Sequence, residues 1–111
     1  MRTLIAIAML GIGVNVSLSA VLTPDELRQK IIGKNCTWIK GKSGGSVSYA
    51  ADGQAFAESQ GGPHLGNWRL SGNQICDKYN DMRKGKEACF TFDEVSPGNY
   101  KGSIGFTATC N

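Results

Sequence analysis

The segment Gly66–Phe92, GNWRLSGNQICDKYNDMRKGKEACFTF, carries the pattern that decides the fold. Two strand-like stretches flank a charged loop that has a cysteine near each end, Cys76 and Cys89: Asn67–Tyr79, which a turn at Ser71-Gly72-Asn73 divides into two strands, and Ala88–Phe92. Aromatic and β-branched residues favour strands, and a charged run between two such stretches favours a connecting loop. The segment therefore predicts a hairpin that a disulfide closes.

Hydrophobic alternation continues on both sides of this hairpin. Strand patterns occupy four further stretches: Cys36–Lys40, Ser46–Tyr49, Gln54–Glu58 and Tyr100–Cys110. Gly41–Gly45 and Gln60–Gly66 are rich in glycine and predict loops between them. The spacing indicates a mainly β fold of about seven short strands in a small antiparallel barrel or sandwich.

A single short helix precedes the strands. Thr23-Pro24-Asp25-Glu26 matches a capping box with proline at the first helical position, and Gly33 is typical of the residue that follows a helix. Leu27, Ile31 and Ile32 form an apolar face. We expect the helix to dock against the sheet or to close one end of a barrel, because so short a helix is marginal alone.

Residues 1–20 have the layout of a secretory signal peptide, with one positive charge at Arg2, an apolar run and a small-residue end. The apolar run is too short and interrupted for a transmembrane helix, so we expect no integral membrane segment in the mature chain. Residues 21–111 then form one β-rich domain, which we expect in the periplasm or secreted.

The four cysteines all lie in the predicted mature part. An even number in a short exported chain indicates disulfides, and four cysteines allow three pairings. We favour Cys76 with Cys89, which closes the hairpin, and Cys36 with Cys110, which joins the first strand to the last.

The mature chain has 11 basic and 9 acidic residues, once Arg2 is removed from the 12 basic residues of the whole sequence. This balance is too even to indicate a nucleic-acid partner. His64 is the only histidine, which disfavours a metal site or a catalytic triad, and we expect it in an exposed loop. No cofactor is expected.

Gly41-Lys42-Ser43-Gly44-Gly45 formally matches the G-x-S-x-G pattern of serine hydrolases. That pattern works on a turn between a strand and a helix, whereas a strand follows here. We therefore expect no enzymatic activity. The alternative that we retain is a hydrolase that uses Ser43.

Candidate partner-binding residues lie in the predicted loops. The loop Asp77–Glu87 mixes both signs of charge, and a disulfide at its ends would lower the entropy cost of binding. The candidates are Lys42, Ser43, His64, Lys78, Arg83, Lys84 and Lys86.

Gly66-Asn67-Trp68-Arg69-Leu70 with Gly72 and Cys76, followed by Cys89-Phe90-Thr91-Phe92, resembles a loose group of small exported proteins of Gram-negative bacteria. In size and strand plan the chain also resembles periplasmic inhibitors of proteases and lysozyme, although only Ser46 and Tyr49 suggest the lysozyme-inhibitor loop motif. The resemblance implies a binding role and carries over no catalytic residue. We expect an exported protein that engages a protein partner as an inhibitor, immunity protein or envelope accessory factor; the alternative is a barrel that carries a small apolar ligand.

Overall fold

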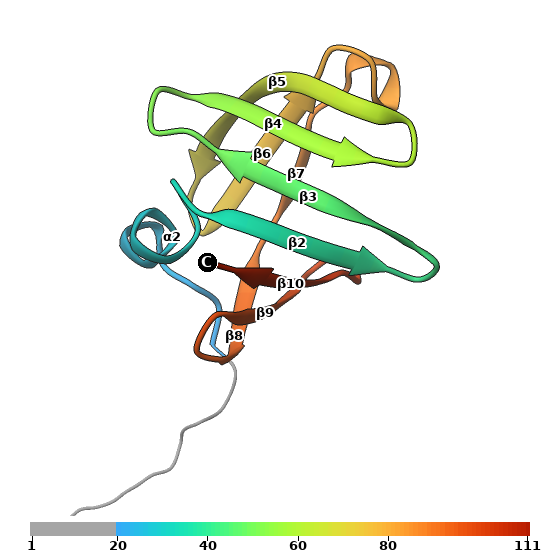
Figure 1. Ribbon diagram of the computed structural model, residues 1–111. Helices are drawn as coiled ribbons and strands as arrows, with labels where there is room; N and C mark the ends of the chain where they lie inside the picture. The colour runs from blue at the N-terminus through green and yellow to red at the C-terminus, as the bar shows by residue number, and fades with distance from the viewer. Residues whose placement is uncertain (1–19) are drawn as a thin grey trace, which may run out of the picture.

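The computed structural model describes residues 20–111, and the remainder of the predicted signal peptide lies outside this part (Figure 1). One helix, α2 (Pro24–Lys30), precedes a nine-stranded antiparallel sheet in the order β7-β6-β5-β4-β3-β2-β10-β9-β8. A 3-10 turn, η1 (Arg83–Gly85), lies between β6 and β7. The strands are β2 (Asn35–Lys40), β3 (Ser43–Tyr49), β4 (Gln54–Ser59), β5 (Gly62–Ser71), β6 (Gln74–Tyr79), β7 (Ala88–Phe90), β8 (Phe92–Ser96), β9 (Asn99–Gly102) and β10 (Thr107–Cys110).

The sheet curls into a nearly closed barrel. Its two outermost strands, β7 and β8, are separated only by Thr91, so one bent length of chain forms both edges. The N-terminal end of the described chain covers the free edge of β8, where the Leu22 N–H donates to the Phe92 carbonyl at 2.8 Å. Between β7 and β8, the Ser103 N–H donates to the Thr91 carbonyl at 3.1 Å and extends the β8–β9 pairing by one residue. These contacts satisfy backbone groups that an open edge would expose.

Helix α2 closes one end of the barrel (Figure 1). The predicted capping box is confirmed, because Thr23 and Glu26 exchange side-chain to backbone hydrogen bonds. Leu27 and Ile31 are fully buried in the core. Gly33 follows the helix with φ of +81°, and its N–H donates to the Tyr49 carbonyl at 2.8 Å, which ties the helix end to β3.

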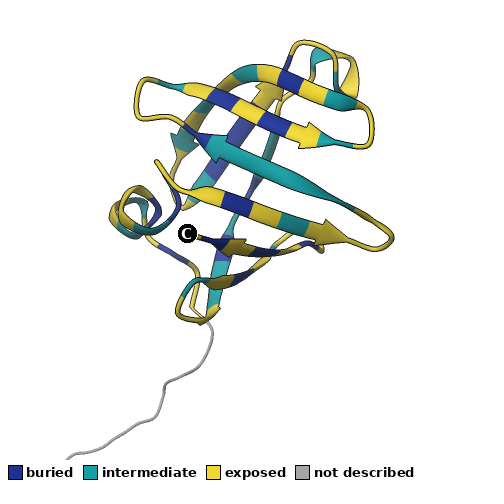
Figure 2. Ribbon diagram, viewed as in Figure 1, coloured by how far each residue is buried: buried dark blue, intermediate teal, exposed yellow. Residues whose placement is uncertain are grey.

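Both predicted disulfides are confirmed. Cys36 and Cys110 are opposite each other on β2 and β10, and Cys76 and Cys89 are opposite each other on β6 and β7. The interior between these strands holds an aromatic cluster with ring centroids 5.3–6.0 Å apart, formed by Phe90, Phe92, Tyr100 and Phe106. Burial alternates along the strands, as Figure 2 shows for β4.

The mainly β barrel with one helix is confirmed, but the predicted number of about seven strands is wrong. The stretch Tyr100–Cys110 is a hairpin of β9 and β10, in which Tyr100 pairs with Ala108. The chain turns between Gly102 and Phe106, and the Phe106 ring packs where a Cβ on Gly102 would lie. Glycine at this position therefore lets the ring fold back onto the preceding strand.

The predicted loop Gln60–Gly66 is also wrong. Strand β5 already begins at Gly62, which pairs with Ser59, so only Gln60 and Gly61 form the turn. Likewise β3 begins at Ser43, within the predicted Gly41–Gly45 loop. Within residues 20–111, no helix combines the length and apolar character needed to cross a membrane.

Candidate functional site at the open end of the barrel

The barrel contains a cavity of about 250 Å³. Its lining includes Lys40 at the end of β2, Arg83 in the loop after β6 and Ile104 in the β9–β10 turn, all at the end opposite α2. In Figure 1 the β2–β3 and β4–β5 turns project at this end, away from the helix. The helix therefore closes one end of the barrel, and the cavity opens at the other.

The cavity walls are mainly apolar and come from most strands of the barrel. Interior-facing side chains supply them, because alternate residues of each strand point inward. The principal wall residues are Trp38, Val47, Ala57, Ala88, Phe106 and Ala108. Three of these are alanines on β4, β7 and β10, and their small side chains leave the space that larger residues would fill.

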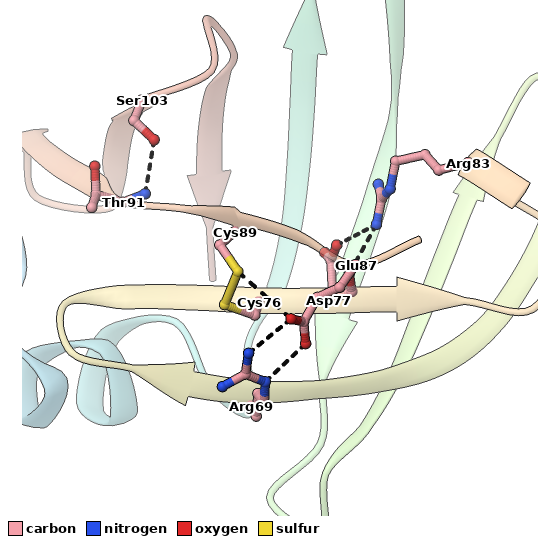
Figure 3. The surroundings of a disulfide bond; sticks show 8 residues. All are labelled: Arg69, Cys76, Asp77, Arg83, Glu87, Cys89, Thr91 and Ser103. Carbon is pink, nitrogen blue, oxygen red and sulfur yellow. Dashed lines mark hydrogen bonds and ion pairs between the residues drawn. A yellow bond between two sulfur atoms is a disulfide. The ribbon is translucent and has the colours of Figure 1, made fainter. Parts of the chain in front are cut away.

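A buried carboxylate lies in the cavity wall. Asp77 points inward from β6, where its side chain is only 5% exposed. Its Oδ2 accepts a hydrogen bond from the Tyr49 hydroxyl at 2.8 Å and a longer one from the Tyr79 hydroxyl at 3.4 Å. Its Oδ1 pairs with the Arg83 guanidinium at 2.7 Å, from the position shown in Figure 3. The carboxylate is thus held by three partners.

Burial dominates the titration of this cluster. It raises the pKa of the Asp77 carboxyl, although the Tyr49 hydroxyl and the Arg83 guanidinium act in the opposite direction. Burial and the nearby Asp77 charge also raise the pKa of the Tyr49 and Tyr79 hydroxyls, with Tyr49 well above its usual range. Both tyrosines consequently act as hydrogen-bond donors to the carboxylate.

The loop at the cavity mouth has an uncommon backbone. Arg83 and Lys84 both have positive φ, 54° and 55°, a conformation that costs a residue with a side chain about 1–2 kcal/mol. The Arg83 side chain offsets this strain, because it also donates to the Asp77 carbonyl at 3.0 Å and lies over the Tyr79 ring. The ion pair with Asp77 therefore positions the loop at the mouth.

The structure separates the charged residues predicted for partner binding into two groups. Lys78, Lys84 and Lys86 are exposed, and so are Lys42 and Ser43 at the β2–β3 turn. Arg83 is also exposed, with a side chain 36% accessible, but its guanidinium pairs with the buried Asp77. Ser43 lies in a β-hairpin, without the strand-to-helix turn that the G-x-S-x-G pattern requires.

Glu87, at the end of the loop that contains Arg83, contacts the outer face of the barrel. Glu87 forms a two-pronged ion pair with Arg69, with both N···O distances at 2.8 Å (Figure 3). Arg69 is paired with Cys76 across β5 and β6, so this ion pair lies beside the disulfide.

The prediction that His64 lies in an exposed loop is wrong. His64 lies on β5 and is 7% exposed. Its Nε2 is 3.1 Å from the Ser59 hydroxyl, and its Nδ1 is 2.9 Å from an Asp81 carboxylate oxygen. The imidazole thus links the β4–β5 hairpin to the loop after β6.

Sequence reasoning missed Asp77, Ser59 and Asp81 as site residues. Asp77 alternates with Ile75 and Tyr79, so strict period two along β6 would have placed this carboxylate inside. Ser59 was missed because the predicted loop over residues 60–66 left His64 outside a strand. Without the β4–β5 pairing, nothing indicated that the two side chains are neighbours.

Within residues 20–111, one group of metal-binding residue types is close enough to share an ion: Cys76, Glu87 and Cys89. Both sulfurs are joined in the disulfide, so neither is a thiolate. Glu87 alone remains as a ligand there, and it is paired with Arg69.

Comparisons with protein-family models, with curated proteins and with solved structures found no match to this chain. The resemblance to small exported proteins therefore stays a prediction.

Proposed function

We propose that the protein binds a small apolar molecule in the open end of its barrel and acts as an exported carrier in the periplasm or outside the cell. The observation that carries this proposal is the apolar cavity of about 250 Å³. A barrel interior that served only as a core would be packed to the density of an organic crystal. Two disulfides in a chain of this size are typical of an oxidising compartment, which supports export.

The cavity limits the size of the ligand. An engineered protein cavity of about 150 Å³ binds benzene, so by the same scale this one holds about ten non-hydrogen atoms. Lys40 lies at the mouth, while Asp77 in the wall is already paired. A ligand with an apolar body and a polar group toward the mouth satisfies both features.

Calorimetric titration with toluene and with indole tests the proposal. We expect saturable binding of one molecule per chain, and its loss in Ala57→Leu, whose larger side chain enters the cavity. Phe56→Ala is the matched control on the same strand, because Phe56 is 40% exposed on the outer face. Loss of binding in Phe56→Ala, or no binding by the wild type, would reject an interior site.

A second candidate is the protein partner that the sequence suggests. The supporting observation is that Lys78 near the end of β6 and Lys84 and Lys86 in the loop that follows are exposed, and that the Cys76–Cys89 disulfide joins the two strands beside this loop. Affinity capture from envelope extracts with wild type and with a triple alanine variant of these lysines tests it. A partner retained by the wild type and lost by the variant would support this role, and identical captured proteins would reject it.

A further inference from the structure

Ser59, His64 and Asp81 form a continuous hydrogen-bonded chain at the open end of the barrel. The Ser59 Oγ is 3.1 Å from His64 Nε2, and His64 Nδ1 is 2.9 Å from Asp81 Oδ1. We propose that this chain makes Ser59 the nucleophile of an esterase site, which hydrolyses small esters with a short apolar acyl group. The barrel would then convert a ligand as well as hold it.

The hydrogen bonds determine which nitrogen of His64 carries the proton. An ionised carboxylate can only accept, so the Nδ1 beside Asp81 carries the hydrogen. Nε2 of the neutral ring is then an acceptor for the Ser59 hydroxyl. This is the tautomer in which imidazole can take the proton of a serine nucleophile.

The β4–β5 hairpin brings the serine and the histidine together. Because Ser59 pairs with Gly62, and Ala57 with His64, Ser59 and His64 are diagonal neighbours on one face. The Asn80 N–H donates to the Leu65 carbonyl at 3.1 Å, which holds the chain next to Asp81 against β5. The imidazole is only 7% exposed and is bonded at both nitrogens, so its orientation is held before a substrate arrives.

The turn beside the serine places Gly61 next to the His64 imidazole. Gly61 has no side chain, and a Cβ there would lie 3.6 Å from His64 Nε2. Gln60 and Gly61 lie outside the β4–β5 pairing, so their N–H groups are candidates to stabilise the oxyanion. Ala57, two residues before Ser59 on the same face, lines the apolar cavity. The placement of the acyl group in the cavity depends on the proposed ligand site, whereas the Ser59–His64–Asp81 contacts do not.

The reaction balances with water as the only co-reactant. Ser59 Oγ attacks the ester carbonyl while its proton moves to His64 Nε2. The bond to the leaving oxygen then breaks, and that oxygen takes the proton from Nε2 and departs as an alcohol. Water, deprotonated by the same nitrogen, cleaves the acyl-serine ester, so one ester and one water give one acid and one alcohol.

Asp81 is a positioning residue, because it touches only the histidine. Its side chain is 61% exposed, so solvent screens its charge far more than in a buried triad. We expect Asp81→Asn to lower kcat for ester hydrolysis about tenfold and to leave KM nearly unchanged. Asp81→Glu should retain part of the kcat that Asp81→Asn loses, which a purely structural role for the carboxylate would not predict.

Covalent labelling with diisopropyl fluorophosphate is the direct test. The Ser59 oxygen forms a bond to phosphorus, fluoride leaves, and the hydroxyl proton passes through His64. We expect one diisopropylphosphoryl group per chain, located at Ser59 by peptide mass mapping. Ser59→Ala should abolish it and lower hydrolysis of p-nitrophenyl butyrate at least about 100-fold.

Ser43→Ala is the matched control, since it removes an exposed hairpin serine outside this chain of contacts. Circular dichroism shows whether Ser59→Ala is still folded, so that loss of the nucleophile can be distinguished from unfolding. A folded wild type that gains no adduct at Ser59, or equal labelling of folded Ser59→Ala, would overturn the esterase site. Labelling without toluene binding would reject the cavity as the ligand site and keep the nucleophile, whereas toluene binding without labelling would reject the nucleophile alone.

Discussion

Replacing Tyr49 with phenylalanine removes one buried oxygen and leaves the ring in place. Tyr49 is 2% exposed, and its hydroxyl donates to Asp77 Oδ2 at 2.8 Å. The other donor to that oxygen, Tyr79, is 3.4 Å away, beyond the usual length of a strong hydrogen bond. In Tyr49→Phe the carboxylate therefore keeps Arg83 on one oxygen and only a weak donor on the other.

The expected loss follows from the charge and burial of the acceptor. A hydrogen bond to a charged group contributes about 1.5–3 kcal/mol, and we expect about 2 kcal/mol for Tyr49→Phe near neutral pH. For a domain of this size that corresponds to a fall in Tm of about 8–16 °C. Tyr79→Phe is the matched control and should cost less than about 1 kcal/mol, because its bond is longer.

The pH dependence of this difference provides a second check. The Tyr49 hydroxyl favours the ionised carboxylate, so its removal raises the pKa of Asp77 further than burial already does. The penalty of Tyr49→Phe should shrink as pH falls and Asp77 becomes protonated. Urea unfolding at pH 4 and pH 7 measures both effects. Equal penalties for the two tyrosine variants, or a penalty that grows toward acid pH, would refute the role given to Tyr49.

Three further predictions concern the barrel wall and its disulfide. Asp77→Asn should abolish the loss of stability that the wild type shows as pH rises from the ordinary aspartate pKa of about 3.9 through the raised folded value, because the amide cannot ionise; urea unfolding across that range measures it. Gly66→Ala should cost about 3 kcal/mol in chemical denaturation, since a Cβ would overlap the Lys78 carbonyl across β5 and β6, and an unchanged midpoint would contradict this packing. Replacing both Cys76 and Cys89 with serine should lower the free energy of unfolding by about 3 kcal/mol, and equal melting temperatures would reject the disulfide as a stabilising staple.

The helix and the disulfides were predicted correctly from the sequence. The capping box at Thr23–Glu26 depends only on adjacent residues, and the structure confirms it. The pairing of Cys36 with Cys110 followed from expecting the first and last strands to meet, which a closed barrel requires. The capping box needs no information about distant contacts, whereas the Cys36–Cys110 pairing, across 74 residues, needs the assumption that the barrel closes.

Turn positions were less predictable, because neighbouring glycines allow the turn to form at more than one place. In Gln60-Gly61-Gly62-Pro63, every position is compatible with a loop, and only pairing between β4 and β5 selects the two-residue turn. The split of Tyr100–Cys110 into a hairpin depends likewise on the Phe106 ring reaching Gly102. Alternation alone cannot distinguish one long strand from two short ones that pair with each other.

The candidate site depended on these same long-range contacts. A loop over residues 60–66 hid the neighbouring positions of Ser59 and His64, so a single histidine was judged insufficient for a triad. No local pattern indicated that Arg83, which stays a candidate for a partner, has positive φ and pairs with Asp77 in the barrel wall. The exposed lysines of that loop stay candidates for a partner.

Nuclear magnetic resonance of alanine-methyl-labelled protein with bound toluene tests the interior site most directly. Ala57, Ala88 and Ala108 line the cavity from three strands, while Ala55 is buried outside its lining. We predict nuclear Overhauser contacts from toluene to all three cavity methyl groups and none to Ala55. Toluene contacts confined to the outer face around Phe56, or no contacts at saturating toluene, would contradict the cavity as the ligand site.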